Sequence, residues 1–98
     1  MQIKIHEAYR KIVALADSNL IGKTFSEGIK EIKINPNFFQ GEERSPQEVI
    51  EILRDMDRED ATFNIVGKES IECALKAGVI DKEGVFYIDS IPIALGLL

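Results

Sequence analysis

The chain has 98 residues, of which 45% are hydrophobic and 30% are charged, and its formal net charge is −5. This length predicts one compact domain over residues 1–98, and the acidic balance makes DNA an unexpected partner, because a phosphate backbone needs a basic patch. The single cysteine, Cys73, excludes an internal disulfide and suits a reducing compartment, so we expect a cytoplasmic protein. With no apolar stretch of about 18 residues and no secretion signal, we expect no membrane association.

The first sixteen residues have the pattern of a β-hairpin. Residues 3–6 alternate between apolar and polar side chains, and the segment KIVALA, residues 11–16, is almost entirely apolar. Alternation indicates a strand with one buried face, and a short apolar run indicates a strand buried on both faces. Residues 7–10 are expected to form the connection.

A third strand follows a long connection. Residues 17–28 are interpreted as a turn, and residues 29–34 alternate again, which predicts a short strand. Pro36 lacks a backbone donor and Gly41 frees the backbone, so we expect the segment between them to break the structure.

Two helices are predicted next. Ser45, Pro46 and Glu48 form the N-terminal signature of a helix over residues 45–56, in which a capping box precedes an apolar stripe. That stripe consists of Val49, Ile52, Leu53 and Met56. A second helix over residues 68–77 is predicted to bury Ile71, Ala74 and Leu75 and to end at Gly78.

Short strands complete the pattern. Residues 61–67 are interpreted as a strand, with a helical extension as the alternative, and residues 85–89 as another. The apolar tail Ile91–Leu98 is either a last core strand interrupted by Pro92 or a self-association surface. The sequence therefore predicts an α+β fold: a small single domain with an N-terminal β-hairpin, further short strands and two packed helices.

The segment DSNLIGKT, residues 17–24, ends like a phosphate-binding loop. The full motif requires a glycine five residues before Gly22, and the chain has Asp17 there. An acidic side chain at that position would repel a phosphate and obstruct the converging backbone amides. We therefore interpret the segment as a structural turn.

Other candidate sites are equally incomplete. Gly67 and Lys68 precede a predicted helix, whose N-terminus could attract an anion, but a strand-to-helix turn is favoured. His6 is interpreted as a surface residue of a strand, and Cys73 as a small buried residue. One histidine and one cysteine do not make a zinc site of several soft ligands. The sequence thus predicts no catalytic residues, no metal and no cofactor.

Phe38 and Phe39 are adjacent aromatics in the predicted break. Adjacent side chains seldom bury together, so one ring is expected to be partly exposed. It would either anchor a partner or attach the loop to the core, and the second reading is favoured.

Separated segments of the chain, from Asn19 onward, resemble the archaeal family catalogued as domain of unknown function 424. The resemblance is carried by LIGKTFSEG (20–28), FFQGEE (38–43), NIVGKESIECALKAGVI (64–80) and the proline of SIPIA (90–94). It implies a small archaeal cytoplasmic α+β protein and supplies no activity. The proximity of family genes to translation-factor genes favours an accessory role in translation.

The last block differs from the family pattern. It usually reads Val-Pro-His-Ala-Gln, whereas Pro92 is followed here by Ile93, Ala94 and Leu95. Any histidine function that the family has at this block is therefore not expected of this chain.

The leading hypothesis is a non-catalytic binding or accessory module with a protein or ribonucleoprotein partner. If the family blocks meet on one surface, they form a site; if they lie apart and buried, they determine the fold. The candidate binding surface consists of Gly22, Lys23, Thr24, Glu27, Gly28, Phe39, Gly41, Asn64, Gly67 and Lys68.

Three other hypotheses remain open. Direct RNA binding would need Lys23, Lys30, Lys33 and Lys68 on one face, with Phe38 or Phe39 as a stacking platform. A small enzyme would use Lys23, Thr24, Glu27 and Asn64. A homo-oligomer would form through Ile91–Leu98.

Overall fold

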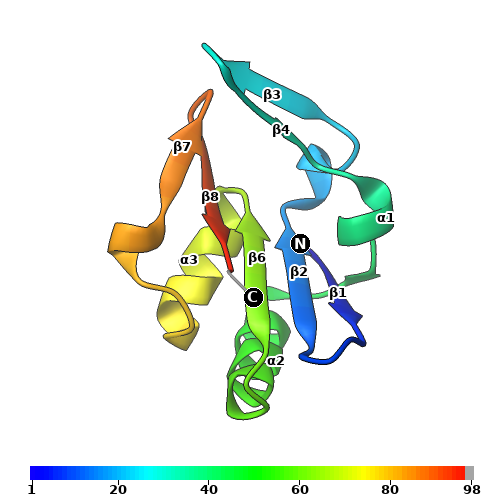
Figure 1. Cartoon of the computed structure of the whole chain (residues 1–98). Coiled ribbons are helices and arrows are strands. Elements are labelled where there is room, and N and C mark those ends of the chain that lie inside the picture. The colour runs from blue at the N-terminus through cyan, green and yellow to red at the C-terminus, as the bar shows by residue number, and fades with distance from the viewer. Residues whose placement is uncertain (97–98) are drawn as a thin grey trace.

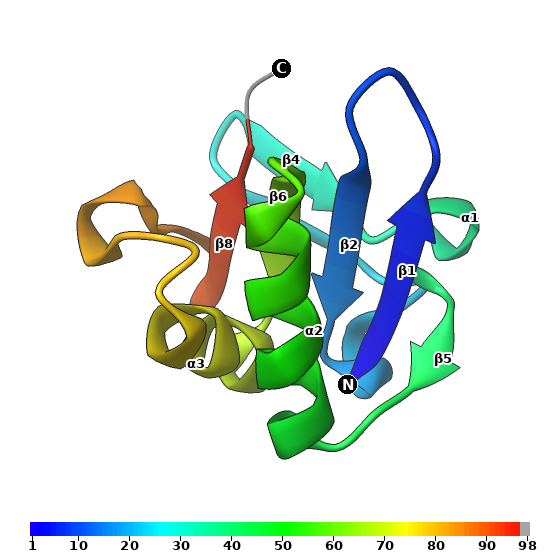
Figure 2. The ribbon, with the colours of Figure 1, turned by 90° about the horizontal axis from the view of Figure 1, so that it is seen from below.

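A computed structural model describes residues 1–96 and contains a six-stranded mixed sheet with helices on one face. Helices α2 (Pro46–Arg58) and α3 (Lys68–Ala77) cover that face, while the short helix α1 (Pro36–Phe39) and a separate hairpin lie on the other, as Figures 1 and 2 show. The hairpin consists of β3 (Thr24–Glu27) and β4 (Lys30–Lys33). The sheet order is β5 (Glu42–Glu43), β1 (Gln2–His6), β2 (Ile12–Ala16), β6 (Thr62–Val66), β8 (Ile91–Leu95) and β7 (Phe86–Ile88).

The predicted N-terminal hairpin is confirmed. Strands β1 and β2 pair antiparallel, with Gln2 opposite Ala16 and His6 opposite Ile12. Strand β2 is also the parallel neighbour of β6, and its residues 13–16 are fully buried. The apolar run thus marks a central strand with side chains packed on both faces.

The sheet separates two apolar layers. Facing α2 and α3 is a cluster of side chains from the strands and both helices: Met1, Ile3, Val13, Leu15, Val49, Leu53, Phe63, Ile65, Ile71, Cys73, Ala74 and Ala94. On the opposite face, a second cluster packs beneath α1 and the β3–β4 hairpin: Ala14, Ala16, Leu20, Ile34, Phe39, Val66, Ile88 and Ile93. Successive residues of a strand point to opposite faces, so β2 and β6 supply both layers.

The two predicted helices are confirmed, with one error in the buried face. At α2, the Ser45 hydroxyl accepts a hydrogen bond from the Glu48 amide and the Glu48 carboxylate accepts one from the Ser45 amide, which completes the capping box. Helix α3 ends at Gly78 in the left-handed conformation. Leu75 was predicted to be buried, but it is 38% exposed, because Ser70 and Cys73 occupy the inner face instead.

The interpretation of residues 17–28 as a turn was wrong in its second half. Residues Thr24–Glu27 form strand β3, with Phe25 opposite Ile32 of β4 and both side chains packed on the second cluster. A strand of four residues with one apolar side chain gives almost no alternation to read. Gly28, at φ 64°, makes the reversal between the two strands.

The predicted break at residues 36–41 also contains structure. Asn35 caps α1 by accepting a hydrogen bond from the Asn37 amide, and Pro36 occupies the first helical position. The chain then forms the two-residue strand β5, which pairs with β1. Neither element is long enough to show a period in the sequence.

Pro92 lies inside the sheet, between β6 and β7, although proline was expected to disfavour a strand there. Its carbonyl accepts a hydrogen bond from the Gly67 amide at 2.9 Å. The reciprocal bond would need a donor on Pro92, but the Gly67 carbonyl already accepts from Ile71 of α3. The missing N–H therefore leaves no acceptor unsatisfied.

Candidate functional site

The segments DSNLIGKT (17–24) and NIVGKES (64–70) meet at the carboxyl ends of the parallel strands β2 and β6. Asp17, which follows β2, is buried and directs its carboxylate at the first turn of α3. Its Oδ1 accepts from the Ser70 amide at 2.8 Å and from Ser70 Oγ at 2.7 Å, and its Oδ2 accepts from the Glu69 amide at 3.2 Å. Asp17 is thus a capping residue that acts on α3 from a distant part of the sequence.

This contact explains why Gly67 stands before α3. Its φ is 110°, and a Cβ there would lie 2.3 Å from Cγ of Asp17. The anion position at the N-terminus of α3 is therefore occupied by the Asp17 carboxylate, with Gly67 leaving room for it. Lys68 follows as an exposed first residue of the helix. The structural interpretation of the DSNLIGKT and NIVGKES segments fits this geometry.

Three more candidate residues hold the fold. Gly22, at φ 89°, donates its amide to the Ile34 carbonyl at 2.7 Å, which begins the hairpin. A Cβ on Gly41 would lie 2.1 Å from the carbonyl oxygen of Ile3, because the chain passes close to β1. Phe39 is only 5% exposed and belongs to the second core cluster. These three residues serve packing and chain reversal.

The polar candidates are dispersed. Lys23 and Thr24 are exposed where β3 begins, and Glu27, at its end, accepts a hydrogen bond from the Asp89 amide at 2.8 Å. Asn64 lies half-buried in β6, with Ala14 and Leu95 as its neighbours on the adjacent strands. The four residues that an enzyme was predicted to use are thus divided between the hairpin and the central sheet.

His6 and Cys73 occupy separate packing environments and do not form a catalytic histidine–cysteine pair. The His6 ring stacks on Phe38 with centroids 4.7 Å apart, and its Nε2 lies 2.8 Å from the Phe38 carbonyl oxygen. His6 is therefore half-buried, whereas a solvated residue was expected. Burial raises the pKa of the Cys73 thiol. Within residues 1–96, no three histidine, cysteine or carboxylate side chains gather as metal ligands would.

An apolar groove lies between the β3–β4 hairpin and strands β7–β8. It encloses about 490 Å³ and has Ile29, Ile32, Phe86, Ile88 and Leu95 among its lining residues, with Lys30 and Glu31 on the hairpin side. Ile29, at the hairpin reversal, is fully exposed, Phe86 is 39% exposed and Leu95 is 50% exposed. Large apolar side chains from separate segments thus remain in contact with solvent around one groove.

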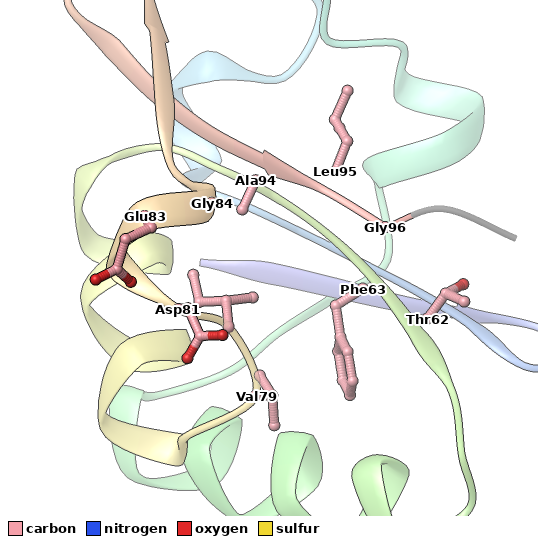
Figure 3. A pocket seen from close by; sticks show the side chains of 10 residues that line it. Thr62, Phe63, Val79, Asp81, Glu83, Gly84, Ala94, Leu95 and Gly96 are labelled. Carbon is pink, nitrogen blue, oxygen red and sulfur yellow. The ribbon is translucent and has the colours of Figure 1, made fainter.

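A second cavity, of about 540 Å³, opens at the ends of β6 and β8, as Figure 3 shows. Phe63 and Val79 point toward α2, and the carboxylates of Asp81 and Glu83 stand at its side. Phe63 and Ala94 are already buried in the core. The apolar part of this cavity therefore offers less free side-chain surface than the groove.

Sequence reasoning did not find the groove. The family blocks directed attention to residues with a special backbone or a polar group, and these proved to be mainly internal. The available signal was the pair Phe86 and Tyr87 in a strand of three residues, together with Ile29 beside a turn glycine. Their exposure depends on which elements cover them, which the pattern alone does not specify.

The family resemblance is confirmed by the sequence itself. Residues 5–96 match a family model described as "Protein of unknown function (DUF424)". The chain belongs to this family. In this DUF424 protein, Ile93 lies on β8, between strands β6 and β7, and its side chain is fully buried in the second core cluster. At this position the chain therefore has a core residue.

A crystal structure described as an uncharacterized conserved protein from Methanopyrus kandleri has the same fold. It superposes with a TM-score of 0.83 over 99% of this chain and 93% of that chain, at 18% sequence identity. None of the curated proteins matches the sequence. Within residues 1–96, no helix is long and apolar enough to cross a membrane.

Proposed function

We propose that this DUF424 protein is a non-catalytic binding module that docks a protein, alone or within a ribonucleoprotein, in the groove between the β3–β4 hairpin and strands β7–β8. The observation that carries this proposal is the exposure of Ile29, Phe86 and Leu95 around one groove. Contiguous apolar side chains of this size are typical of interfaces, because leaving them in water is unfavourable. Aromatic side chains such as Phe86 are frequent binding anchors.

The carboxylates among the candidate residues already accept hydrogen bonds from the protein itself, which favours binding over catalysis. Asp17 is committed to three hydrogen bonds at α3, and Glu27 is committed to the β7–β8 turn. A general acid or base needs an acceptor or donor directed at a substrate. The groove has only Lys30 and Glu31 as charged lining residues, and both lie on the hairpin that bounds it.

Direct RNA binding receives less support. Lys30 and Lys33 are three residues apart on β4 and therefore point to opposite faces of the hairpin. Phe39 is buried, and Phe38 already stacks on His6, so the expected stacking platform is covered. A single-strand site requires lysines and open aromatic faces on the same surface.

Site-specific photocrosslinking in cells tests the proposal. A photoreactive amino acid replaces Ile29 in one variant and Leu95 in another, with Tyr9 as the control, because Tyr9 is fully exposed in the β1–β2 loop, away from the groove residues. We expect a protein adduct at Ile29 and Leu95 that survives nuclease treatment, and none of the same mass at Tyr9. Fractionation with ribosomal particles would support the accessory role in translation.

Equal adducts at all three positions, or none at the two groove positions, would contradict this function. Adducts that disappear with nuclease would instead favour RNA as the contact. Each variant is first checked for the native circular dichroism spectrum and thermal midpoint, so that a loss of crosslinking is not caused by unfolding.

A further inference from the structure

We propose that strand β7 pairs with β7 of a second copy, so that the groove closes in a two-fold symmetric homodimer. This inference rests on the proposed function, because it names the occupant of the same groove. It differs from self-association through Ile91–Leu98, because residues 91–94 lie inside the sheet and residues 97–98 lie outside the described part of the chain.

The two edges of the sheet are built differently. Strand β5, at one edge, consists of Glu42 and Glu43, which are both exposed. Charged side chains on an edge discourage pairing with another strand. Strand β7, at the other edge, consists of Phe86, Tyr87 and Ile88 and has no charge, and Tyr87 is 58% exposed. Only the β7 edge is therefore suited to accept a further strand.

The hydrogen-bonding pattern identifies the open position of β7. Tyr87 stands opposite Pro92, which has no N–H and whose carbonyl accepts from Gly67 on the β6 side. The N–H and C=O of Tyr87 therefore point away from β8, toward solvent. The neighbouring outward amides are satisfied within the chain: the Val85 amide donates to the Lys82 carbonyl and the Asp89 amide to Glu27.

An edge residue whose backbone donor and acceptor both point outward is self-complementary. If a two-fold axis passes beside Tyr87, each copy donates its Tyr87 amide to the Tyr87 carbonyl of the other. Residues that stand opposite each other share a face of the sheet, so Phe86 of the second copy falls beside Ile88 of the first. That face contains the groove, and the pairing covers its exposed aromatic side chain.

Charged residues flank strand β7 on both sides. Lys82 precedes β7 and Asp89 follows it, and both side chains are exposed. Antiparallel pairing brings Lys82 of one copy toward Asp89 of the other at both ends of the joint. Asp81 and Glu83, which flank Lys82, are also exposed and oppose this attraction, so charge does not decide the pairing. With two backbone hydrogen bonds and a small contact area, we expect a dissociation constant on the order of 10 to 100 µM.

Sedimentation equilibrium over a range of protein concentrations tests the pairing. The wild-type chain is expected to change reversibly from monomer to dimer. Tyr87→Lys places a charge on the edge and should weaken dimerisation at least about tenfold. Tyr87→Pro removes the open backbone donor together with the aromatic side chain and should also weaken dimerisation. Tyr9→Lys is the matched control, since it changes an equally exposed tyrosine elsewhere.

A wild-type chain that stays monomeric at about 1 mM would overturn this inference, because that concentration lies well above the expected dissociation constant. A dimer that survives in both folded Tyr87 variants would overturn it as well. If the chain is monomeric but Ile29 and Leu95 still crosslink to another protein, the proposed function stands and only the second copy is wrong. If crosslinking also fails, both proposals fail.

Discussion

The junction between β2 and α3 and the edge strand β7 differ in whether their polar and apolar groups have partners inside the protein. At the junction, three donors surround the buried Asp17 carboxylate and Gly67 gives it room. At the edge, Tyr87 is 58% exposed, and the apolar Phe86 beside it is 39% exposed. The first region carries the motif-like sequence and serves the fold. The second has no motif and is the better candidate for binding.

Replacing Gly67 with alanine should break the junction and have the largest effect. The new Cβ would lie 2.3 Å from Cγ of Asp17, and the backbone holds φ at 110°. We expect a loss of roughly 3 to 5 kcal/mol in the free energy of unfolding, measured by urea denaturation. Gly28→Ala is the control, because its φ is 64° but a Cβ there has no neighbour within 4 Å, so only about 1 kcal/mol should be lost. Equal losses in the two variants would show that the contact with Asp17 is unimportant.

Removing the carboxylate itself should cost less. Asp17→Ala leaves the Glu69 and Ser70 amides without their acceptor, and we expect a loss of about 2 to 3 kcal/mol in urea denaturation. Asp55→Ala is the control, since Asp55 is an exposed partner of Arg58 on α2 and should change stability by less than about 0.5 kcal/mol. A loss at Asp17 no larger than at Asp55 would contradict the assigned capping role.

Helix α2 is capped by neighbouring, exposed residues, whereas α3 is capped by the distant Asp17. The α2 cap should make a smaller contribution to stability, and that contribution should depend on pH. The backbone hydrogen bond from Ser45 lowers the pKa of Glu48 below 4.5. A carboxylate with a lowered folded-state pKa stabilises the protein above its unfolded pKa and loses that contribution as pH falls through the folded value. The stability difference between wild type and Glu48→Gln should therefore shrink between about pH 7 and about pH 3. Glu51→Gln, on the exposed side of α2, serves as the control in the same urea titrations, and a difference that stays constant with pH would contradict this origin.

The sequence predicted the elements whose signals are local. The Ser45 and Glu48 cap, the apolar run of β2 and the Gly78 terminus each depend on neighbouring residues, and each is confirmed. Strand β3, helix α1 and strand β5 were missed because they have four residues or fewer and, unlike the equally short β4, do not lie in an alternating apolar segment. Short elements form where a distant surface covers them, and a period cannot be read over so few residues.

The candidate site shows the same limit. Gly22, Gly41 and Gly67 were placed on the candidate binding surface, but their environment is one of close packing and chain reversal. The role of Asp17 depends on Ser70, which is 53 residues away in sequence. Exposure of Phe86 depends likewise on the sheet order, in which β7 is the last strand. Neither long-range relation has a local signature in the sequence.

Ile29→Ser should produce the smallest change in stability. It should also show most clearly that a residue of the groove can matter for binding without mattering for the fold. Ile29 is fully exposed at the hairpin reversal, so removing its side chain should alter the free energy of unfolding by less than about 0.5 kcal/mol. Ile34→Ala is the contrasting variant, since Ile34 is fully buried in the second core cluster and should lose about 2 to 4 kcal/mol in urea denaturation. If Ile29→Ser leaves the stability intact but reduces the adduct formed from a photoreactive group at Leu95, an exposed apolar side chain has been retained for binding. If both measurements are unchanged, Ile29 belongs to neither the fold nor the interface, and the docking surface contracts to β7 and β8.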